Sequence, residues 1–254
     1  MSDPRRSLRF ADDPHVRFWW HHTGGRDYVP AVYGVLTDDE WAVMEEWYAE
    51  TAARDAVGEW NPPAMSLIHG FVDGGGLRRV LQIGHYYGYS ALLIGFWLRA
   101  MGGERRLVSA DIDPEATAFT QRYLDRAGLG DHVTLVECDA ATPDGMAAIL
   151  AAFGGEMPEL IVRDASYDYR VIRRELGLWV PRMASQSVML INGTSTMASK
   201  WDESGRGGPH KAVRDWCRRR RDVSYLSLND RVGAPGVEPS AYADGCGLGI
   251  LQKR

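Results

Sequence analysis

The chain has 254 residues, of which 45% are apolar and 25% charged, and its formal net charge is −5. This composition is typical of one globular α/β domain with additional segments, and the negative charge gives no general attraction to nucleic acid or anionic membranes. Cys138, Cys217 and Cys246 are too widely spaced for a disulfide framework or a zinc motif, which favours a reducing, cytoplasmic location. The N-terminal arginines precede no apolar run, so we expect neither a signal peptide nor a membrane anchor.

The N-terminal part of the sequence is unusually aromatic. We expect residues 1–60 to form an extension or lid and residues 61–254 to form the main domain. The stretch "RFWWHHTGG" contains Trp19, Trp20, His21 and His22, and with "GEWNPP" at 58–63 it is expected to cover the mouth of a pocket. Packing of this stretch against a neighbouring subunit is an equally open alternative, which would make the protein a homo-oligomer.

Two helices are expected after this segment. Thr37 and Glu40 have the spacing of a capping box, and the residues that follow, 41–50, repeat apolar positions at helical spacing. A second helical run over residues 64–72 ends at the triple glycine 74–76.

From residue 78 onward, short apolar runs alternate with longer helical patterns. Strands that are apolar throughout and alternate with helices indicate a parallel sheet covered on both faces. Near the C-terminus two strands follow each other without a helix, which predicts an antiparallel pair at one sheet edge. We therefore expect a doubly wound, mostly parallel, seven-stranded α/β fold with an antiparallel C-terminal strand. The expected strands are 78–84, 106–112, 132–140, 159–165, 187–193, 223–228 and 247–253; the expected helices among them are 90–101, 114–128, 145–153, 169–183 and 210–221.

The loop after the first expected strand, "QIGHYYGYSA", contains two glycines four residues apart, Gly84 and Gly88. In open α/β sheets the first strand-to-helix turn is the usual nucleotide site. The spacing differs from the G-x-G-x-x-G of dinucleotide sites, which argues against pyrophosphate binding. Asp111 ends the second strand, where an acidic side chain can accept hydrogen bonds from ribose hydroxyls. The glycines could instead serve only close packing of strand and helix.

Two further acidic residues have competing interpretations. Asp113 precedes Pro114 and is expected to be a helix N-cap rather than a ligand. Asp139 ends the third strand and could cap a turn or bind a ligand.

Taken in order, "VLQIGHYYGYSALL", "LVSADIDPEA", "VTLVECDA" and "LIVRDASYDY" resemble class I S-adenosylmethionine-dependent O-methyltransferases of the catechol and caffeoyl-coenzyme A type and related natural-product enzymes. The resemblance spans roughly residues 60–254 and implies the Rossmann-like methyltransferase fold with S-adenosylmethionine as cofactor. It also implies cofactor-binding roles for Gln82, Gly84, Tyr86, Gly88, Ser90, Asp111, Asp139 and Ala140. In these roles Gly84 and Gly88 shape the methionine-end pocket, Ser90 binds the cofactor carboxylate at a helix start, and Asp111 binds the ribose. Asp139 and Ala140 bind the adenine edge. As a cation, the sulfonium can be attracted by the aromatic face of Tyr86 or Tyr87; the alternative is that these rings only fill the core.

The sequence departs from the family pattern at several positions. Gln82 stands where an acidic residue is usual, so it supplies no charge to the cofactor ammonium. The metal-binding members collect acidic oxygen ligands, of which this chain keeps Asp164 but has Asn192 and Gly193 after the fifth strand. Since Mg²⁺ requires oxygen ligands, we expect no bound metal. Tyr167 occupies the position at which relatives have a basic residue.

Without a metal, an acceptor hydroxyl needs a general base. The catalytic candidates are His210, Tyr167 and Asp164, with His85, His21 and His22 as further possible bases. Three functions stay open: O-methylation of a small hydroxylated metabolite, a non-methylating reaction such as a cyclisation on the same fold, and a non-catalytic interaction module. The intact Ser90 and Asp111 argue against the last.

Overall fold

The computed structural model describes residues 29–56, 58–229, 231 and 245–254. The aromatic stretch at 19–22 lies outside the described residues. The helices are α1 (Ala31–Gly34), α2 (Asp38–Ala53), α3 (Pro62–Gly74), α4 (Tyr89–Met101), α5 (Pro114–Ala127), α6 (Pro143–Ala152), α7 (Tyr169–Trp179) and α8 (Gly208–Cys217), with 3₁₀ turns η4 (Val180–Arg182) and η5 (Ala198–Trp201). Among the described helices, none has both the length and the apolar character needed to cross a membrane.

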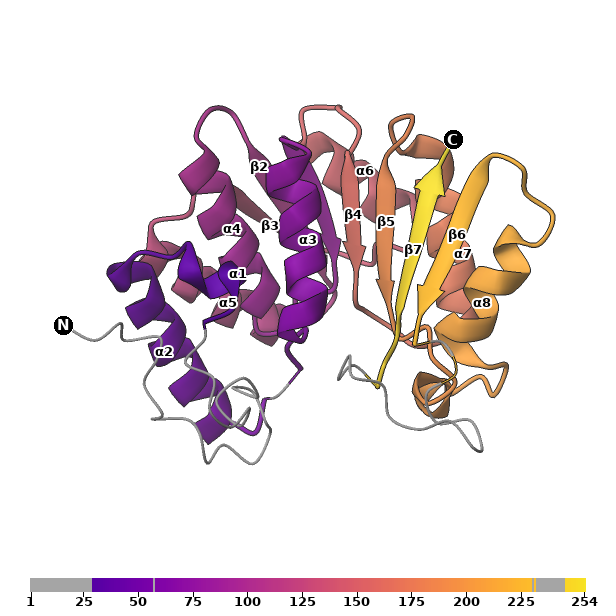
Figure 1. Ribbon diagram of the computed structural model, residues 1–254, viewed down its shortest axis with the longest axis horizontal. Coiled ribbons are helices and arrows are strands. Elements are labelled where there is room, and N and C mark those ends of the chain that lie inside the picture. Colours follow the sequence, from indigo (N-terminus) through magenta and orange to yellow (C-terminus); the bar gives the residue numbers. More distant parts are fainter. Residues whose placement is uncertain (1–28, 57, 230, 232–244) are drawn as a thin grey trace.

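The strands form one seven-stranded sheet in the order β3-β2-β1-β4-β5-β7-β6 (Figure 1). They are β1 (Arg79–Ile83), β2 (Arg106–Asp111), β3 (Val133–Glu137), β4 (Leu160–Arg163), β5 (Val188–Asn192), β6 (Val223–Leu228) and β7 (Leu248–Lys253). The strands β1 to β5 pair in parallel, and β7 runs antiparallel to both β5 and β6. The predicted doubly wound fold and the antiparallel pair at one edge are confirmed.

Helix starts follow the local sequence signals. The Thr37 hydroxyl accepts from the Glu40 N–H at 3.2 Å and the Glu40 carboxylate accepts from the Thr37 N–H at 2.7 Å, so the predicted capping box is formed. Asp113 caps α5, as expected, by accepting from the N–H groups of Glu115 and Ala116. A side-chain cap satisfies N–H groups that have no partner within the helix.

Two predicted helices are too long. The stretch 169–183 is α-helical only to Trp179, because Pro181 lacks the N–H that an α-helix requires. The helix predicted at 210–221 begins earlier, at Gly208, and ends at Cys217. Beyond it Arg220 pairs with Asp222 two residues later at 2.5 Å, a spacing at which side chains of a helix do not face each other.

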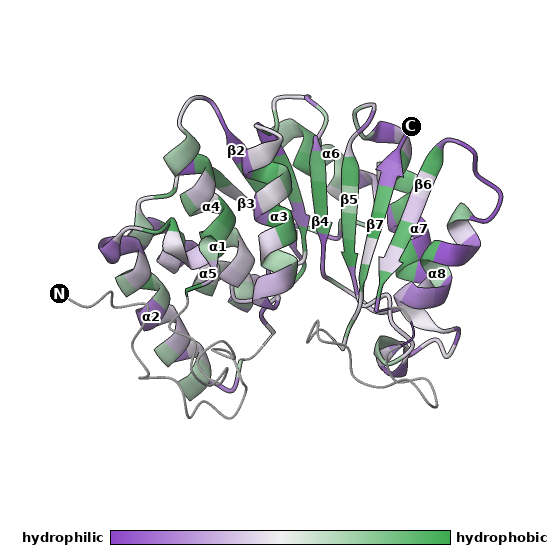
Figure 2. Cartoon of the chain, viewed as in Figure 1, coloured by the Kyte–Doolittle hydropathy of each residue, from purple (hydrophilic) through white to green (hydrophobic). Residues whose placement is uncertain are grey.

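The sheet has one apolar core on each face, and consecutive strand residues alternate between them. In β1, Val80 packs with α2, α3, α4 and α5 on one face, and Leu81 packs with α6, α7 and α8 on the other. Figure 2 shows these strands as mostly apolar. Helices cover both faces of the sheet, so only the ends of the strands stay accessible. In sheets of this kind ligands bind at the carboxyl ends of the strands.

Buried tyrosines tie the N-terminal helices to the start of α4. The Tyr33 hydroxyl hydrogen-bonds that of Tyr89 and lies 3.4 Å from that of Tyr48. Burial raises the pKa of Tyr33 to about 12, so its hydroxyl keeps its proton. The Trp47 indole of α2 also donates to the Tyr87 carbonyl at 2.7 Å. These bonds hold α2 against the glycine loop that follows β1.

Candidate active site

The two glycines of the loop after β1 have backbone conformations that suit only glycine. Gly84 has φ +86° and Gly88, the N-cap of α4, has φ +92°. A Cβ on Gly84 would lie 2.0 Å from the Asp164 carbonyl oxygen, and one on Gly88 would lie 2.5 Å from a Thr120 methyl group. Close packing is therefore one function of both glycines. The contact between Gly84 and Asp164 joins the carboxyl ends of β1 and β4, where the strand order reverses.

Asp111 holds the glycine loop from the end of β2. Its Oδ2 accepts from the N–H groups of His85 at 2.9 Å and Tyr86 at 2.8 Å, and its Oδ1 accepts from the Asp113 N–H at 3.1 Å. Tyr86 has φ +46°, a region that non-glycine residues seldom occupy. The two bonds to Asp111 stabilise this turn, so Asp111 has a structural function whether or not it contacts a ligand.

A chain of buried polar side chains lies beneath the loop. Gln82 donates from Nε2 to the Ser90 hydroxyl at 2.5 Å and to the Gly84 carbonyl at 3.0 Å, and it accepts from the Ser109 hydroxyl at 3.2 Å. Nδ1 of His85 lies 3.2 Å from the same Ser109 hydroxyl. Gln82 is 1% exposed, so it supports the loop from below and does not line the pockets above it.

The His85 imidazole is buried in this chain. Burial lowers its pKa to about 4, although the nearby carboxylates of Asp111 and Asp113 act in the opposite direction. The ring is consequently neutral at neutral pH. Its second nitrogen, Nε2, lies 3.2 Å from the Thr117 hydroxyl, so both nitrogens have structural partners and His85 is poorly placed as a general base.

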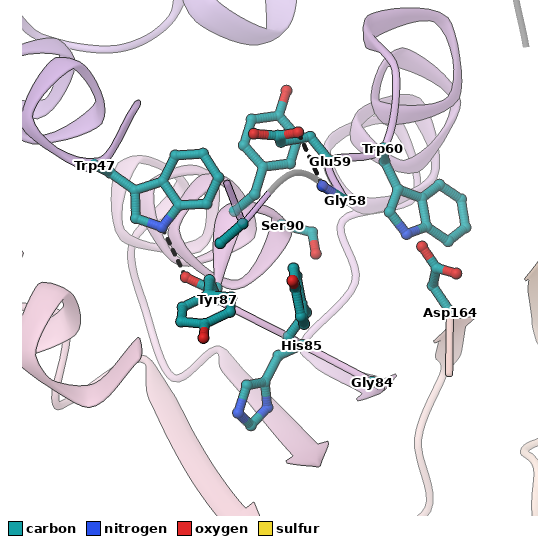
Figure 3. A pocket seen from close by; sticks show the side chains of 13 residues that line it. Trp47, Gly58, Glu59, Trp60, Gly84, His85, Tyr87, Ser90 and Asp164 are labelled. Carbon is teal, nitrogen blue, oxygen red and sulfur yellow. Dashed lines mark hydrogen bonds between the residues drawn. The ribbon is translucent and has the colours of Figure 1, made fainter. Parts of the chain in front are cut away.

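The first pocket lies over the N-terminus of α4 (Figure 3). The sequence-predicted residues that line it are Gly84, His85, Tyr86, Gly88, Ser90 and Asp164, joined among others by Trp47, Glu59 and Trp60. The cavity is about 20 Å³, room for roughly one water molecule. The Tyr86 side chain borders it, is 43% exposed and lies against Gly58. A larger ligand would therefore displace the exposed Tyr86 side chain.

Glu59 and Trp60 stand on the far side of this pocket from the glycine loop. Trp60 is 5% exposed, and its indole N–H has no hydrogen-bond partner among the described residues. Figure 3 shows this N–H directed across the pocket toward the Asp164 carboxylate. Glu59 accepts from the Gly58 N–H at 3.1 Å. The segment was expected to form part of a lid, but neither side chain was predicted to be a site residue.

The second pocket adjoins the first at Gly84 and has a volume of about 170 Å³. It lies over the carboxyl ends of β1, β2 and β3 and brings together Asp111, Asp139 and Ala140, with Ile112, which is 69% exposed. Asp139 accepts from the Ala141 N–H at 2.8 Å, so it also caps the turn, as one interpretation of the sequence expected. This pocket has one apolar wall and carboxylates at its edge, features suited to a nucleoside.

A buried ion pair shapes the loop between the two pockets and α7. Arg163, the last residue of β4, donates from Nε to the Glu175 carboxylate at 2.8 Å, and both side chains are almost completely buried. Burial raises the pKa of Glu175, while the charge of Arg163 acts in the opposite direction. The guanidinium also donates to the Ser166 carbonyl. This pair holds the loop that carries Asp164 and Tyr167.

The remaining catalytic candidates gather at the ends of β4 and β5, outside the lining of these two pockets. Tyr167 contacts Gly193, since a Cβ there would lie 2.4 Å from its ring, and it packs edge-on against Trp201 at 5.2 Å between ring centroids. Nδ1 of His210 lies 2.8 Å from the Thr194 carbonyl oxygen. A carbonyl only accepts, so Nδ1 carries a proton, and in the neutral form of the ring the lone pair is on Nε2. His210 thus has the tautomer that a general base requires.

Asp202 organises the loop that leads to His210. The carboxylate is buried and accepts hydrogen bonds from the backbone N–H groups of Tyr169, Ser204, Arg206, Gly207 and Gly208 and from the Ser204 hydroxyl. Burial alone would raise the pKa of Asp202, but the bonds from Ser204, Gly208 and Tyr169 outweigh it and hold the pKa well below its usual range. The start of α8 therefore depends on this one carboxylate.

Asp164, Asn192 and Gly193 occupy the positions at which metal-binding relatives were expected to have ligands. Within the part of the chain that the structure describes, no group of three or more His, Cys, Asp or Glu side chains is arranged to hold a metal ion. Asn192 uses its side-chain oxygen to accept from the Gly193 N–H at 2.8 Å. Asp164, in contrast, faces the first pocket.

The fold and these pockets define a Rossmann-like methyltransferase fold, and comparisons with known proteins agree. Residues 81–194 match the family model described as "Methyltransferase domain". An O-methyltransferase from Bacillus cereus, solved in complex with SAH, superposes with a TM-score of 0.64 at 17% identity, covering 88% of this chain and 96% of that one. The O-methyltransferase TomG from Streptomyces achromogenes, involved in tomaymycin synthesis and solved with SAM, gives 0.61 at 16% identity, covering 97% and 99%.

A curated relative matches over a shorter stretch. It is the "probable cobalt-precorrin-6B C(15)-methyltransferase (decarboxylating)" of Methanothermobacter thermautotrophicus, 40% identical over 72 residues. The match spans 26% of this chain and 38% of that relative. The central part of the chain, residues 81–194, matches the methyltransferase-domain family model, and the resemblance predicted from the sequence motifs is confirmed.

Proposed function

We propose that this protein is an S-adenosylmethionine-dependent O-methyltransferase that methylates a hydroxyl of a small secondary metabolite without a bound metal ion. The observation that carries the proposal is the pair of pockets that meet at Gly84, where the strand order reverses. One lies at the start of α4 and is bordered by the carboxylates of Glu59 and Asp164, and the other suits a nucleoside. A ligand with an amino-acid end and an adenosine end matches both.

The residues present fit this cofactor. Asp111 borders the second pocket. Its carboxylate oxygens have further lone pairs besides those used by its backbone donors, and these can accept hydrogen bonds from ribose hydroxyls. Asp139, Ala140 and Ile112 surround a space for the base. In the first pocket the N-terminus of α4 and the Ser90 hydroxyl suit a carboxylate. When bound, S-adenosylmethionine would supply an electrophilic methyl group.

The chain's own residues would position the acceptor and remove its proton. Methyl transfer depends on in-line approach of the nucleophile, so much of the rate comes from orientation. Tyr167 and Trp201 provide an aromatic wall beside the strand ends, and Nε2 of His210 is the base we assign. Asp164 borders the first pocket, where it can orient polar groups of the ligands.

The nucleoside assignment predicts the effect of changing Asp111. Asp111→Ala is expected to weaken binding of S-adenosylhomocysteine by about 1.5–3 kcal/mol, the usual value of a hydrogen bond to a charged acceptor. Calorimetric titration measures this, and Asp113→Ala is the control, since Asp113 only caps α5. Because Asp111 also holds the loop, Asp111→Asn, which keeps an acceptor oxygen, separates the two effects. An unchanged dissociation constant in both Asp111 variants would remove this residue from the site.

Metal independence is the second prediction for this function. Asp164 is the charged oxygen donor kept at the predicted ligand positions, and the Asn192 oxygen is already used locally, so a divalent cation would meet few protein ligands. We expect methyl transfer to the true acceptor to survive exhaustive chelation of divalent metal ions. Mass spectrometry measures the transfer as the gain of one methyl group. Loss of activity with chelator and its recovery with magnesium would show that Asp164 and Asn192 do form a metal site.

Several finer expectations belong to the same proposal. We place the protein in the cytoplasm, where its cysteines, which form no disulfide among the described residues, would stay reduced. The partner we propose is a small molecule, with residues 1–60 as a lid and homo-oligomer formation open to test. The relatives reported above are methyltransferases, so no observation favours the non-methylating alternative.

A further inference from the structure

The first pocket must provide a negative charge for the ammonium group of the proposed ligand, and the glycine loop does not supply one. The amino-acid end of the proposed ligand carries both a carboxylate and an ammonium group. The N-terminus of α4 favours the carboxylate. Gln82 is neutral and fully hydrogen-bonded beneath the loop, so it cannot neutralise the ammonium. The negative charge facing the pocket comes from Glu59 and Asp164.

Trp60 adds a second and independent sign of a ligand. Trp60 is 5% exposed. Its indole N–H points into the pocket and has no hydrogen-bond partner among the described residues. A buried donor that stays unpaired costs about 1–3 kcal/mol, so such groups are rare unless something else satisfies them. An indole N–H can only donate, so the missing partner is a hydrogen-bond acceptor, which a ligand carboxylate would supply.

We infer that Trp60 and Glu59 recognise the amino-acid end of the cofactor: the Trp60 N–H and the start of α4 bind its carboxylate, and Glu59 with Asp164 binds its ammonium. This inference rests on the proposed function. It assigns recognition of the ammonium charge to residues 58–60, which precede α3, because Gln82 is neutral. It also explains why residues 58–60 lie against the glycine loop, where Gly58 contacts Tyr86.

The test compares two ligands that share an adenosine end. S-adenosylhomocysteine has the amino-acid group, and 5′-methylthioadenosine lacks it. Trp60→Phe keeps an aromatic ring and removes only the N–H. We expect it to weaken S-adenosylhomocysteine about 10- to 100-fold and to change 5′-methylthioadenosine less than about twofold, as measured by calorimetry. Glu59→Gln is expected to show the same selectivity.

Trp97→Phe is the matched control. It removes the same N–H from a buried indole that lines neither pocket, where the N–H donates to the Val32 carbonyl at 3.2 Å. We expect a lower melting temperature and an unchanged ratio of the two dissociation constants. The ratio is measured within one protein preparation, so a general loss of folded protein does not alter it.

The outcomes separate the inference from the proposed function. Failure of the wild-type protein to bind either ligand overturns both. Binding of both ligands with an unchanged ratio in Trp60→Phe and Glu59→Gln overturns the inference and leaves the proposed function intact. Should Trp60→Phe not fold, the ratio in Glu59→Gln decides.

Discussion

Replacing His210 with alanine is expected to lower kcat for methyl transfer by about 100- to 10,000-fold, the usual range for the loss of a general base. The bond from Nδ1 to the Thr194 carbonyl orients the ring and leaves Nε2 able to take the acceptor's proton. Because His210 lines neither pocket, the dissociation constant for S-adenosylhomocysteine should change less than about twofold, since no hydrogen bond to the ligand is lost.

His132→Ala is the control for this prediction. His132 is also half-buried, but it precedes β3 at the opposite edge of the sheet, so its loss should leave kcat unchanged. Single-turnover measurements with saturating cofactor separate chemistry from binding. A His210→Ala enzyme that retains full kcat would show that another group removes the proton, with Tyr167 the next candidate.

Replacing Asp202 with alanine is expected to lower the free energy of unfolding by about 3 kcal/mol, because it leaves the backbone N–H groups of the 204–208 loop without their acceptor. Since this loop begins α8, the variant should also lose activity through misplacement of His210. Denaturant unfolding followed by circular dichroism measures the first effect. Asp202→Asn, which keeps one acceptor oxygen, should cost less.

The contribution of Asp202 depends on pH in a defined direction. Its folded-state pKa lies below the usual value of 3.8, so the unfolded chain binds more protons in the acidic range. The stabilisation by Asp202 is complete above the unfolded-state pKa of 3.8. It is lost as the pH falls from there through the folded-state pKa. The gap between wild type and Asp202→Ala should therefore shrink in acid. Asp222→Ala is the control, because its bridge to Arg220 is exposed and solvent screens it.

Much of the site could be located from the sequence because its residues follow strands. Gly84, Asp111, Asp139 and Asp164 each lie at the carboxyl end of a parallel strand or within two residues after it, and parallel strands end at the same edge of a sheet. Predicting those strands therefore brought the four residues together. Their individual functions are less certain, because Asp111 and Asp139 also have structural partners that the spacing does not reveal.

Gln82 and Trp60 show where sequence reasoning stopped. Gln82 was expected to contact the cofactor because it occupies the family's acidic position, but its hydrogen bonds are all directed beneath the loop. Trp60 was noted only as part of an aromatic lid. Neither orientation could be predicted, because each depends on another element of the fold. Gln82 bonds to Ser90 of α4 and Ser109 of β2, and Trp60 faces the pocket at the start of α4.

The sequence by itself determined the doubly wound sheet, the antiparallel edge pair and the helix caps, because apolar periodicity and caps act over a few neighbouring residues. Tertiary structure decided which way Gln82 faces, whereas α7 ends at a local signal, Pro181. It also decided that residues 58–60, more than 20 positions before the glycine loop, close the pocket over it. These outcomes depend on packing between distant segments, where burial and hydrogen-bond satisfaction are settled only once the whole chain has folded.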